Sequence, residues 1–211
     1  MSNEADLYLE QYKDIYSDNI ILKNEKLDNP QLSSFYNEIK DCTKCELSKT
    51  RQKLVFGMGH PNADIVFVGE APGKNEDIQG IPFVGRGGKL LDKILGAINL
   101  DRSKVYILNV LKCRPPDNRD PLPTEIEKCE SYLVNQLKII KPKLIVALGR
   151  ISAMTLLKNK DSLTNMRGKI HKYEGIDLIV TYHPAALLRN PNFKRPTWDD
   201  FKFIRDKYLN G

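Results

Sequence analysis

Four short apolar runs rich in β-branched residues constrain the fold of this chain more than any other feature. They span residues 64–69, 105–111, 143–148 and 177–182, and each has the length and composition of a buried strand. Apolar residues recur at helical spacing in the stretches between and after them, at 87–99, 124–140, 150–157 and 197–209. Strands that alternate with helices form parallel sheets covered on both faces. We therefore expect an α/β fold with three layers, α/β/α, around a central four-stranded, mainly parallel sheet.

Length and composition place the chain among single-domain globular proteins. Its 211 residues can bury a core without disulfides, and a content of 41% hydrophobic and 28% charged residues excludes wholesale disorder. Residues 31–211 are expected to form the domain, and residues 1–30 a polar N-terminal extension with a short helix around 7–16. Within the domain, Thr124 is expected to cap the helix over 124–140, with Glu127 as its capping-box partner.

The chain carries no signal for export or for a membrane. No apolar run approaches the roughly 20 residues that a membrane span needs, and the acidic N-terminus lacks a secretory pattern. We expect a monomer in the reducing cytoplasm with no membrane partner. The net charge of +6 mildly favours a polyanionic partner and is too weak to name one.

Four cysteines suggest a metal or cluster site. Cys42 and Cys45 form a Cys-x2-Cys pair, and Cys113 and Cys129 stand further apart. Disulfides are not expected in a reducing compartment, and polar neighbours argue against core positions for the four. The count suits a tetrathiolate site for zinc or for an iron–sulfur cluster. The wide second pair favours a cluster, because a zinc ribbon brings two close pairs.

Polar residues follow the predicted strands where ligands bind in open parallel sheets, beyond the carboxyl ends. Glu70 follows the first strand, Asn109 stands near the end of the second, and His183 follows the fourth. Each alone has a structural explanation, as part of a tight turn, as a backbone cap or as a core histidine. Their shared placement predicts a binding site.

The Gly-rich segment 80–89 precedes a helix, as phosphate-binding loops do. It is not a Walker A loop, because the second glycine is followed by Arg-Gly rather than by Lys and Ser or Thr. Phe83 within it is either a platform on which a flat ligand stacks or a loop anchor packed on the core. Both interpretations stay open.

Five motifs in one order resemble the family 4 uracil-DNA glycosylases, the iron–sulfur branch of that superfamily, from about residue 35 to 205. They are Cys-Thr-Lys-Cys, Gly-Glu-Ala-Pro-Gly, Pro-Phe-Val-Gly, Asn109 before Lys-Cys-Arg-Pro-Pro, and His-Pro-Ala-Ala-Leu-Leu-Arg-Asn-Pro. The resemblance implies excision of uracil without strand cleavage, the first step of base excision repair. It also implies a [4Fe–4S] cluster and a uracil pocket; the implied cluster ligands are Cys42, Cys45, Cys113 and Cys129, and the implied pocket residues are Glu70, Ala71, Phe83, Asn109 and His183.

The chemistry of uracil excision gives the pocket residues expected roles. A base in duplex DNA must be flipped out, and Phe83 could then stack on it. The Asn109 amide complements the N3–H and O4 of uracil and disfavours cytosine. The family pattern implies that Glu76 excludes the thymine methyl group, with help from Ala71 or Pro72. His183 is the candidate donor to the uracil oxygen that gains charge as the base leaves.

Two departures from the best-known uracil glycosylases refine the expected mechanism. Those enzymes position water with an aspartate, and this chain has Ala71 at the matching position. Family 4 members share this lack of an aspartate. Of the nearest carboxylates, Glu70 and Asp77, we favour Glu70 for that role. The loop 115–123 contains no histidine, so the covalent adduct of one related branch is not expected.

The expected partner is uracil-containing DNA, single- or double-stranded. Leu187, Leu188 and Arg189 could wedge into the base stack and hold a phosphate. Further backbone contacts are expected from basic residues near the pocket: Arg86, Lys89, Lys112 and Arg114.

Two other functions could use parts of the same pattern. One is a non-catalytic iron–sulfur or zinc nucleic-acid-binding protein on the same fold, and the other is a nucleotide-handling enzyme that uses the Gly-rich loop. A binding protein has no need of the polar set Glu70, Asn109 and His183, and the missing Walker lysine counts against the nucleotide enzyme.

Overall fold

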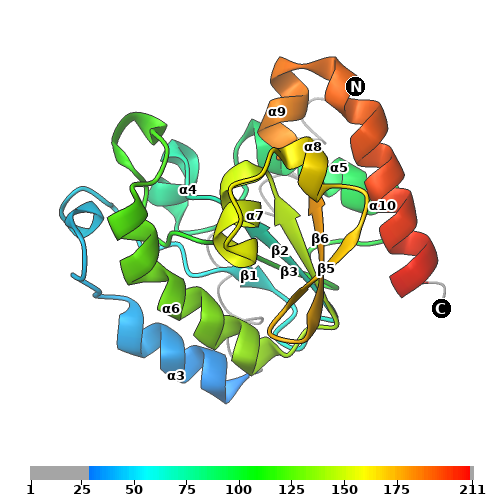
Figure 1. Ribbon diagram of the computed structural model, residues 1–211. Helices are drawn as coiled ribbons and strands as arrows, with labels where there is room; N and C mark the ends of the chain where they lie inside the picture. The colour runs from blue at the N-terminus through cyan, green and yellow to red at the C-terminus, as the bar shows by residue number, and fades with distance from the viewer. Residues whose placement is uncertain (1–28, 210–211) are drawn as a thin grey trace, which may run out of the picture.

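The computed structural model describes residues 29–209, which form one mixed sheet with helices on both faces (Figure 1). The strands are β1 (Met58–Gly59), β2 (Ile65–Gly69), β3 (Tyr106–Asn109), β4 (Leu144–Leu148), β5 (Ile170–Tyr173) and β6 (Ile176–Thr181). The α-helices are α3 (Pro30–Ile39), α4 (Lys74–Gln79), α5 (Arg86–Gly96), α6 (Pro123–Ile140), α7 (Arg150–Leu157), α8 (Leu163–Met166), α9 (Pro184–Arg189) and α10 (Lys194–Tyr208), with short 3-10 turns at Glu46–Lys49, Pro116–Asn118 and Pro191–Phe193.

The sheet contains the four predicted strands at its centre and one further strand at each edge. The strand order is β1-β3-β2-β4-β6-β5. The four central strands are mutually parallel, and β1 and β5 pair with their neighbours antiparallel. The predicted parallel sheet is therefore confirmed, and the two edge strands extend it to six.

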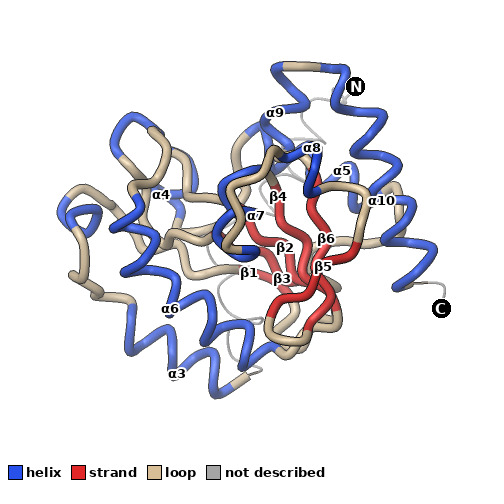
Figure 2. Tube along the Cα trace, in the orientation of Figure 1, coloured by secondary structure: helices blue, strands red, loops and turns tan. Residues whose placement is uncertain are grey.

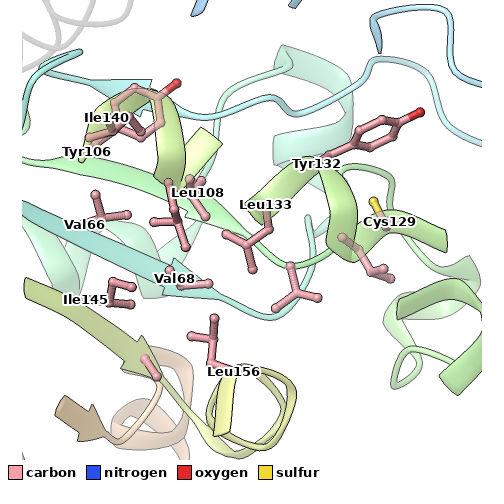
Figure 3. Packing of buried hydrophobic residues seen from close by; sticks show 14 of the residues in the cluster. Val66, Val68, Tyr106, Leu108, Cys129, Tyr132, Leu133, Ile140, Ile145 and Leu156 are labelled. Atoms are coloured by element: carbon pink, nitrogen blue, oxygen red, sulfur yellow. The ribbon is translucent and has the colours of Figure 1, made fainter. Parts of the chain in front are cut away.

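Alternate residues of the central strands supply two separate cores, as a sheet covered on both faces requires. Val66, Val68 and Ile145 face one core, which α3, α6 and α7 cover (Figure 3). Phe67 and Val146 face the other, which α5 and α10 cover, and the tube view places these helices on opposite sides of the strands (Figure 2). The predicted three-layer α/β/α architecture is thus confirmed.

The start of α6 differs from the prediction. The helix begins at Pro123, and the Leu122 backbone N–H donates to Glu125 Oε2 at 2.8 Å. Glu125 is therefore the acidic partner of this helix start, and Thr124 and Glu127 do not form the expected capping box. Arg119 fixes Glu125 in this position through a 2.6 Å ion pair from the preceding loop.

Helix α3 is the first helix of the described residues and has a defined N-terminal cap. Asn29 caps α3, since its side-chain oxygen accepts the backbone N–H groups of Gln31 and Leu32 at 3.0 and 3.1 Å. The helix expected around 7–16 lies outside the described residues. Within 29–209, no helix is long and apolar enough to cross a membrane.

Candidate active site and four-cysteine centre

The carboxyl ends of the four parallel strands meet at one edge of the sheet. Gly69 of β2 pairs with Asn109 of β3, and Leu148 of β4 pairs with Thr181 of β6. A pocket of about 650 Å³ opens beyond these ends. The structure brings every predicted base-binding residue to its lining: Glu70, Ala71, Glu76, Phe83, Asn109 and His183.

Asn109 presents a buried acceptor to this pocket. The residue is 2% exposed, and its Oδ1 has no hydrogen-bond partner within the described part of the chain. Gly69 makes room for it, because a Cβ there would lie 2.3 Å from Asn109 Oδ1 and 2.6 Å from the Phe83 ring. A buried acceptor without a partner is costly, so a ligand N–H fits this position.

Phe83 and His183 form a stacked pair at the pocket wall. Their ring centroids are 5.4 Å apart, and the ring planes are inclined by 27°. Phe83 is 5% exposed and also belongs to the core against α5. The two interpretations of Phe83 that the sequence left open are therefore compatible, because the ring packs on the core and borders the pocket at once.

His183 is held as a neutral hydrogen-bond donor. The Ala185 backbone N–H donates to His183 Nδ1 at 3.1 Å. A neutral imidazole carries one proton, so Nδ1 as acceptor leaves the proton on Nε2. Burial, and then the charge of Arg189, lower the pKa of His183 to about 4. The ring therefore stays neutral at physiological pH with an N–H at Nε2.

Glu70 titrates near neutral pH. Burial, and to a lesser degree the charge of Asp120, raise the pKa of Glu70, the charge of Arg150 lowers it, and together they bring it to about 7. Asp120 and Arg150 also line the pocket. The sequence analysis gave neither residue a role: Arg150 follows the third predicted strand and could have been proposed from that placement, whereas Asp120 stands in a loop without any such signal.

Glu76 ties two walls of the pocket together. Its Oε1 accepts the Gly85 backbone N–H at 2.8 Å, so α4 holds the Gly-rich loop in place. The other carboxylate oxygen, Glu76 Oε2, lies so near the backbone of Gly73 that a Cβ at Gly73 would be 2.7 Å from it. The carboxylate is thereby fixed in a defined position at the edge of the pocket.

Two of the predicted DNA contacts are wrong. Lys112 is completely buried, and its ammonium donates to the Asn109 carbonyl at 2.7 Å, so it cannot reach a phosphate at the surface. Leu187 is 2% exposed, because this face of α9 turns toward the interior. Its neighbour Leu188 is 40% exposed and is the leucine that stands free to wedge.

The remaining predicted DNA contacts lie at the surface or partly exposed. Arg189 is exposed and borders the pocket, and Arg86 and Lys89 are exposed at the start of α5. Arg114 is half-buried and donates to Asn118 Oδ1 at 2.8 Å. These side chains surround the same sheet edge as the pocket.

The four cysteines come together at one place although they are far apart in the sequence. All four line one small cavity between the first cysteine loop and α6. Cys42 and Cys45 are half-buried, while Cys113 and Cys129 are 5% and 8% exposed. The expectation that none is a core position is therefore wrong for the last two, which pack with the core around α6.

Polar groups surround the cysteine sulfurs as they do around bound thiolates. The Tyr132 hydroxyl donates to Cys42 Sγ at 3.1 Å, and the Arg51 guanidinium donates to Cys113 Sγ at 3.3 Å. The Lys112 backbone N–H lies 3.4 Å from Cys129 Sγ. The ammonium of Lys112, buried beside these sulfurs, also fits a site that carries net negative charge.

The four cysteines around one cavity are the donor set of a tetrathiolate site, which can hold zinc or an iron–sulfur cluster. Within residues 29–209, no three His, Cys, Asp or Glu side chains are placed to share one metal ion.

Comparison with known proteins identifies the family of this chain. The family model of the uracil DNA glycosylase superfamily matches residues 56–202. The type-4 uracil-DNA glycosylase of Archaeoglobus fulgidus is 48% identical over 181 residues, which cover 82% of this chain and 91% of that protein.

Two further type-4 uracil-DNA glycosylases match over similar lengths. That of Sulfurisphaera tokodaii is 48% identical, with 83% of this chain and 84% of that protein covered. That of Saccharolobus solfataricus is 44% identical, with 81% and 83% covered. This chain is therefore a member of the uracil DNA glycosylase superfamily.

Proposed function

We propose that this protein excises uracil from DNA by hydrolysing the N-glycosidic bond, which leaves the strand intact and initiates base excision repair. Relatives named type-4 uracil-DNA glycosylases support this function. The observation that carries it is the unpartnered acceptor of Asn109 beside the Phe83–His183 pair. A non-catalytic binding protein is not favoured, because binding alone requires no such polar set.

Recognition rests on the flipped base. Uracil stacks on the Phe83 ring and gives its N3–H to Asn109 Oδ1, while the Asn109 amide N–H donates to uracil O4. Cytosine presents an acceptor and a donor in the reverse positions and leaves both hydrogen bonds unmade. Unmade hydrogen bonds in a buried site are strongly unfavourable.

Bond cleavage places negative charge on the uracil and positive character on the sugar. The His183 Nε2–H donates to the uracil oxygen as this charge develops. This hydrogen bond stabilises the transition state most strongly in a buried site. Ionised Glu70 orients water and accepts its proton. The water oxygen bonds to C1′ as the C1′–N1 bond breaks, and the bonding electrons leave with the uracil.

The thymine methyl group is excluded by the wall around Ala71 and Glu76. The hydrogen bond from Gly85 fixes the Glu76 carboxylate, so this wall does not yield to a larger base. Replacement of Glu76 is therefore expected to relax the discrimination between uracil and thymine.

DNA contacts come from residues around the pocket rim. Leu188 fills the space that the flipped base leaves, and Arg86, Lys89, Arg114 and Arg189 contact phosphates. The substrate is uracil-containing DNA in single- or double-stranded form, bound by a monomer in the cytoplasm.

The four cysteines hold a [4Fe–4S] cluster. When bound, the cluster supplies a structural link between the segments 45–113 and 113–129, and no step of the excision passes through it. Cys42, Cys45, Cys113 and Cys129 are the ligands, and Tyr132 and Arg51 donate hydrogen bonds to the sulfurs.

The test uses oligonucleotides that carry one uracil, one thymine or one cytosine at the same position. Incubation should produce an alkali-labile site only with uracil, and alkali should be required for the strand to break. Tight binding of all three substrates without an abasic product, over a range of salt concentrations, would instead support the binding protein.

A further inference from the structure

Phe83 has a backbone conformation that a phenylalanine does not adopt without support. Its φ is 56°, in the left-handed region that favours glycine. Residues held in that region persist only where the surrounding structure fixes them. Because the backbone sets the direction of the side chain, whatever fixes Phe83 also sets the ring that stacks against His183.

The support comes from Arg102, which lies between α5 and β3 and is not among the residues that line the pocket. Its Nη1 donates to the Pro82 carbonyl at 3.0 Å, and its Nη2 donates to the Phe83 carbonyl. Its Nε donates to Asp92 of α5 at 2.7 Å, and the side chain is only 16% exposed. A rigid guanidinium fork can hold one carboxylate and two successive carbonyls together, which a lysine ammonium cannot.

Helix α5 also packs against the Phe83 carbonyl, through Gly88. A Cβ at Gly88 would lie 1.6 Å from the Phe83 carbonyl oxygen, so only glycine leaves space for it. The Phe83 carbonyl is thus confined by Arg102 and by the bare backbone of Gly88. These two independent contacts explain why the left-handed conformation persists.

We propose that Arg102 is a positioning residue for uracil excision. Through its hydrogen bonds to the carbonyls of Pro82 and Phe83, it holds the Phe83 ring in place against the base. The inference rests on the proposed function and adds a residue that does not touch the base. Without the fork, the backbone at Phe83 relaxes and the ring shifts. A displacement of about 1 Å in an active site can cost about 100-fold in rate.

A double-mutant cycle tests whether Arg102 acts through Phe83. The variants are Arg102→Met, Phe83→Leu and the two combined, with kcat, KM and inhibition by free uracil measured on a single-stranded oligonucleotide. Arg102→Met should lower kcat/KM about 10- to 100-fold and weaken inhibition by uracil. In the Phe83→Leu background, the same substitution should change kcat/KM by less than about 2-fold, because the ring it positions is gone.

Two further variants test whether the loss of activity comes from the lost positive charge or from the loss of an ion pair in general. Arg102→Lys keeps the charge but not the fork, so its kcat/KM should fall as that of Arg102→Met does. Arg205→Met breaks the 2.8 Å ion pair with Asp206 on α10 and should leave excision unchanged. Should Arg102→Met fail to fold, Asp92→Asn loosens the same fork and enters the cycle in its place.

The outcomes distinguish this inference from the proposed function. Equal losses for Arg102→Met in the wild-type and Phe83→Leu backgrounds would overturn the inference alone, since Arg102 would then act independently of the ring. Full activity of Arg102→Lys would also overturn it. Wild-type protein that releases no uracil would overturn the proposed function and the inference with it.

Discussion

Asn109 and Gln136 are two buried amides whose oxygens lack partners among the described residues, and they differ in where they lie. Asn109 borders the pocket, whereas Gln136 of α6 is fully buried in the interior and donates to the Phe56 carbonyl at 2.8 Å. The same substitution at the two sites therefore separates recognition of a base from support of the fold.

Asn109→Leu should lower kcat/KM for uracil excision about 100- to 1,000-fold, because two hydrogen bonds to the buried base are lost. The melting temperature should hardly fall, since Asn109 Oδ1 has no hydrogen-bond partner among residues 29–209 to lose. Gln136→Leu should lower the melting temperature and leave excision intact. Normal excision by Asn109→Leu would contradict the role of this amide.

Glu70 should set the pH dependence of excision. Its pKa of about 7 in the free protein predicts that kcat/KM rises as the pH rises through 7, because only the ionised carboxylate can accept a proton from water. His183, with a pKa of about 4, should contribute no step between pH 5 and 8. Glu70→Gln should lower kcat and remove the rise, and a profile that keeps the rise in this variant would assign it to another group.

The raised pKa of Glu70 also makes the folded protein less stable as the pH rises. The pKa of Glu70 lies above its ordinary value of 4.5 in the folded protein, so the folded state binds the proton more tightly than the unfolded state. Its contribution to stability is therefore present below pH 4.5 and is lost as the pH rises to about 7. Glu70→Gln should lack this loss in urea unfolding curves recorded across that window.

Single residues of the pocket could be predicted where their position follows from a strand end. Asn109 and His183 follow strands whose apolar runs are unmistakable, so the sheet carries them to one edge. Lys112 and Leu187 could not be placed in this way. Whether a side chain beyond a strand, or on a six-residue helix, turns inward depends on the packing partner, and the local pattern does not encode it.

At the scale of elements, α5 provides a matched pair of glycines. A Cβ at Gly88 would collide with the Phe83 carbonyl oxygen, whereas a Cβ at Gly96 would meet nothing within 4 Å. Both residues belong to the same helix, so the intrinsic helical preference of alanine applies to each. Their difference isolates the close approach at Phe83.

Gly88→Ala should destabilise the protein by about 1–3 kcal/mol through overpacking and should lower excision as the Phe83 loop shifts. Gly96→Ala should stabilise it by about 0.5–1 kcal/mol with unchanged excision. Urea unfolding and the excision assay measure both effects. Similar behaviour of the two variants would mean that the Phe83 carbonyl is not confined by α5.

The elements that the sequence did not predict lack a strong local signal. Strand β1 has two residues, and β5 carries His171 and Lys172 among its four, so neither shows an apolar run. Both pair only at an edge of the sheet. At α6, the spacing from Thr124 predicted Glu127 as the capping-box partner, whereas Arg119 fixes Glu125 at the helix start from a loop that the local pattern does not place.

At the scale of the whole molecule, the cysteine site joins segments that are remote in the sequence. Cys42 and Cys45 precede the sheet, Cys113 follows β3, and Cys129 lies within α6. The proposed cluster would cross-link these parts, and its binding free energy would contribute to folding. The sequence predicted the four residues as a set, and the fold explains how they meet.

Protein purified without oxygen should be brown and contain about four iron and four sulfide per chain. Cys113→Ser and Cys129→Ser should lose iron and melt at a lower temperature, because each removes a buried ligand. Metal analysis, absorbance and thermal unfolding measure these effects. Colourless wild-type protein that contains one zinc per chain would contradict the assignment of a cluster.

The central claim is that the pocket at the strand edge hydrolyses the glycosidic bond of uracil in DNA, and mass spectrometry of the reaction products tests it most directly. It should show one free uracil per substrate strand and an intact strand that carries one abasic sugar. The Asn109→Leu and Glu70→Gln variants should form both products more slowly. A substrate strand that releases no uracil, a nicked strand, or a protein–DNA adduct in place of free uracil would contradict the account.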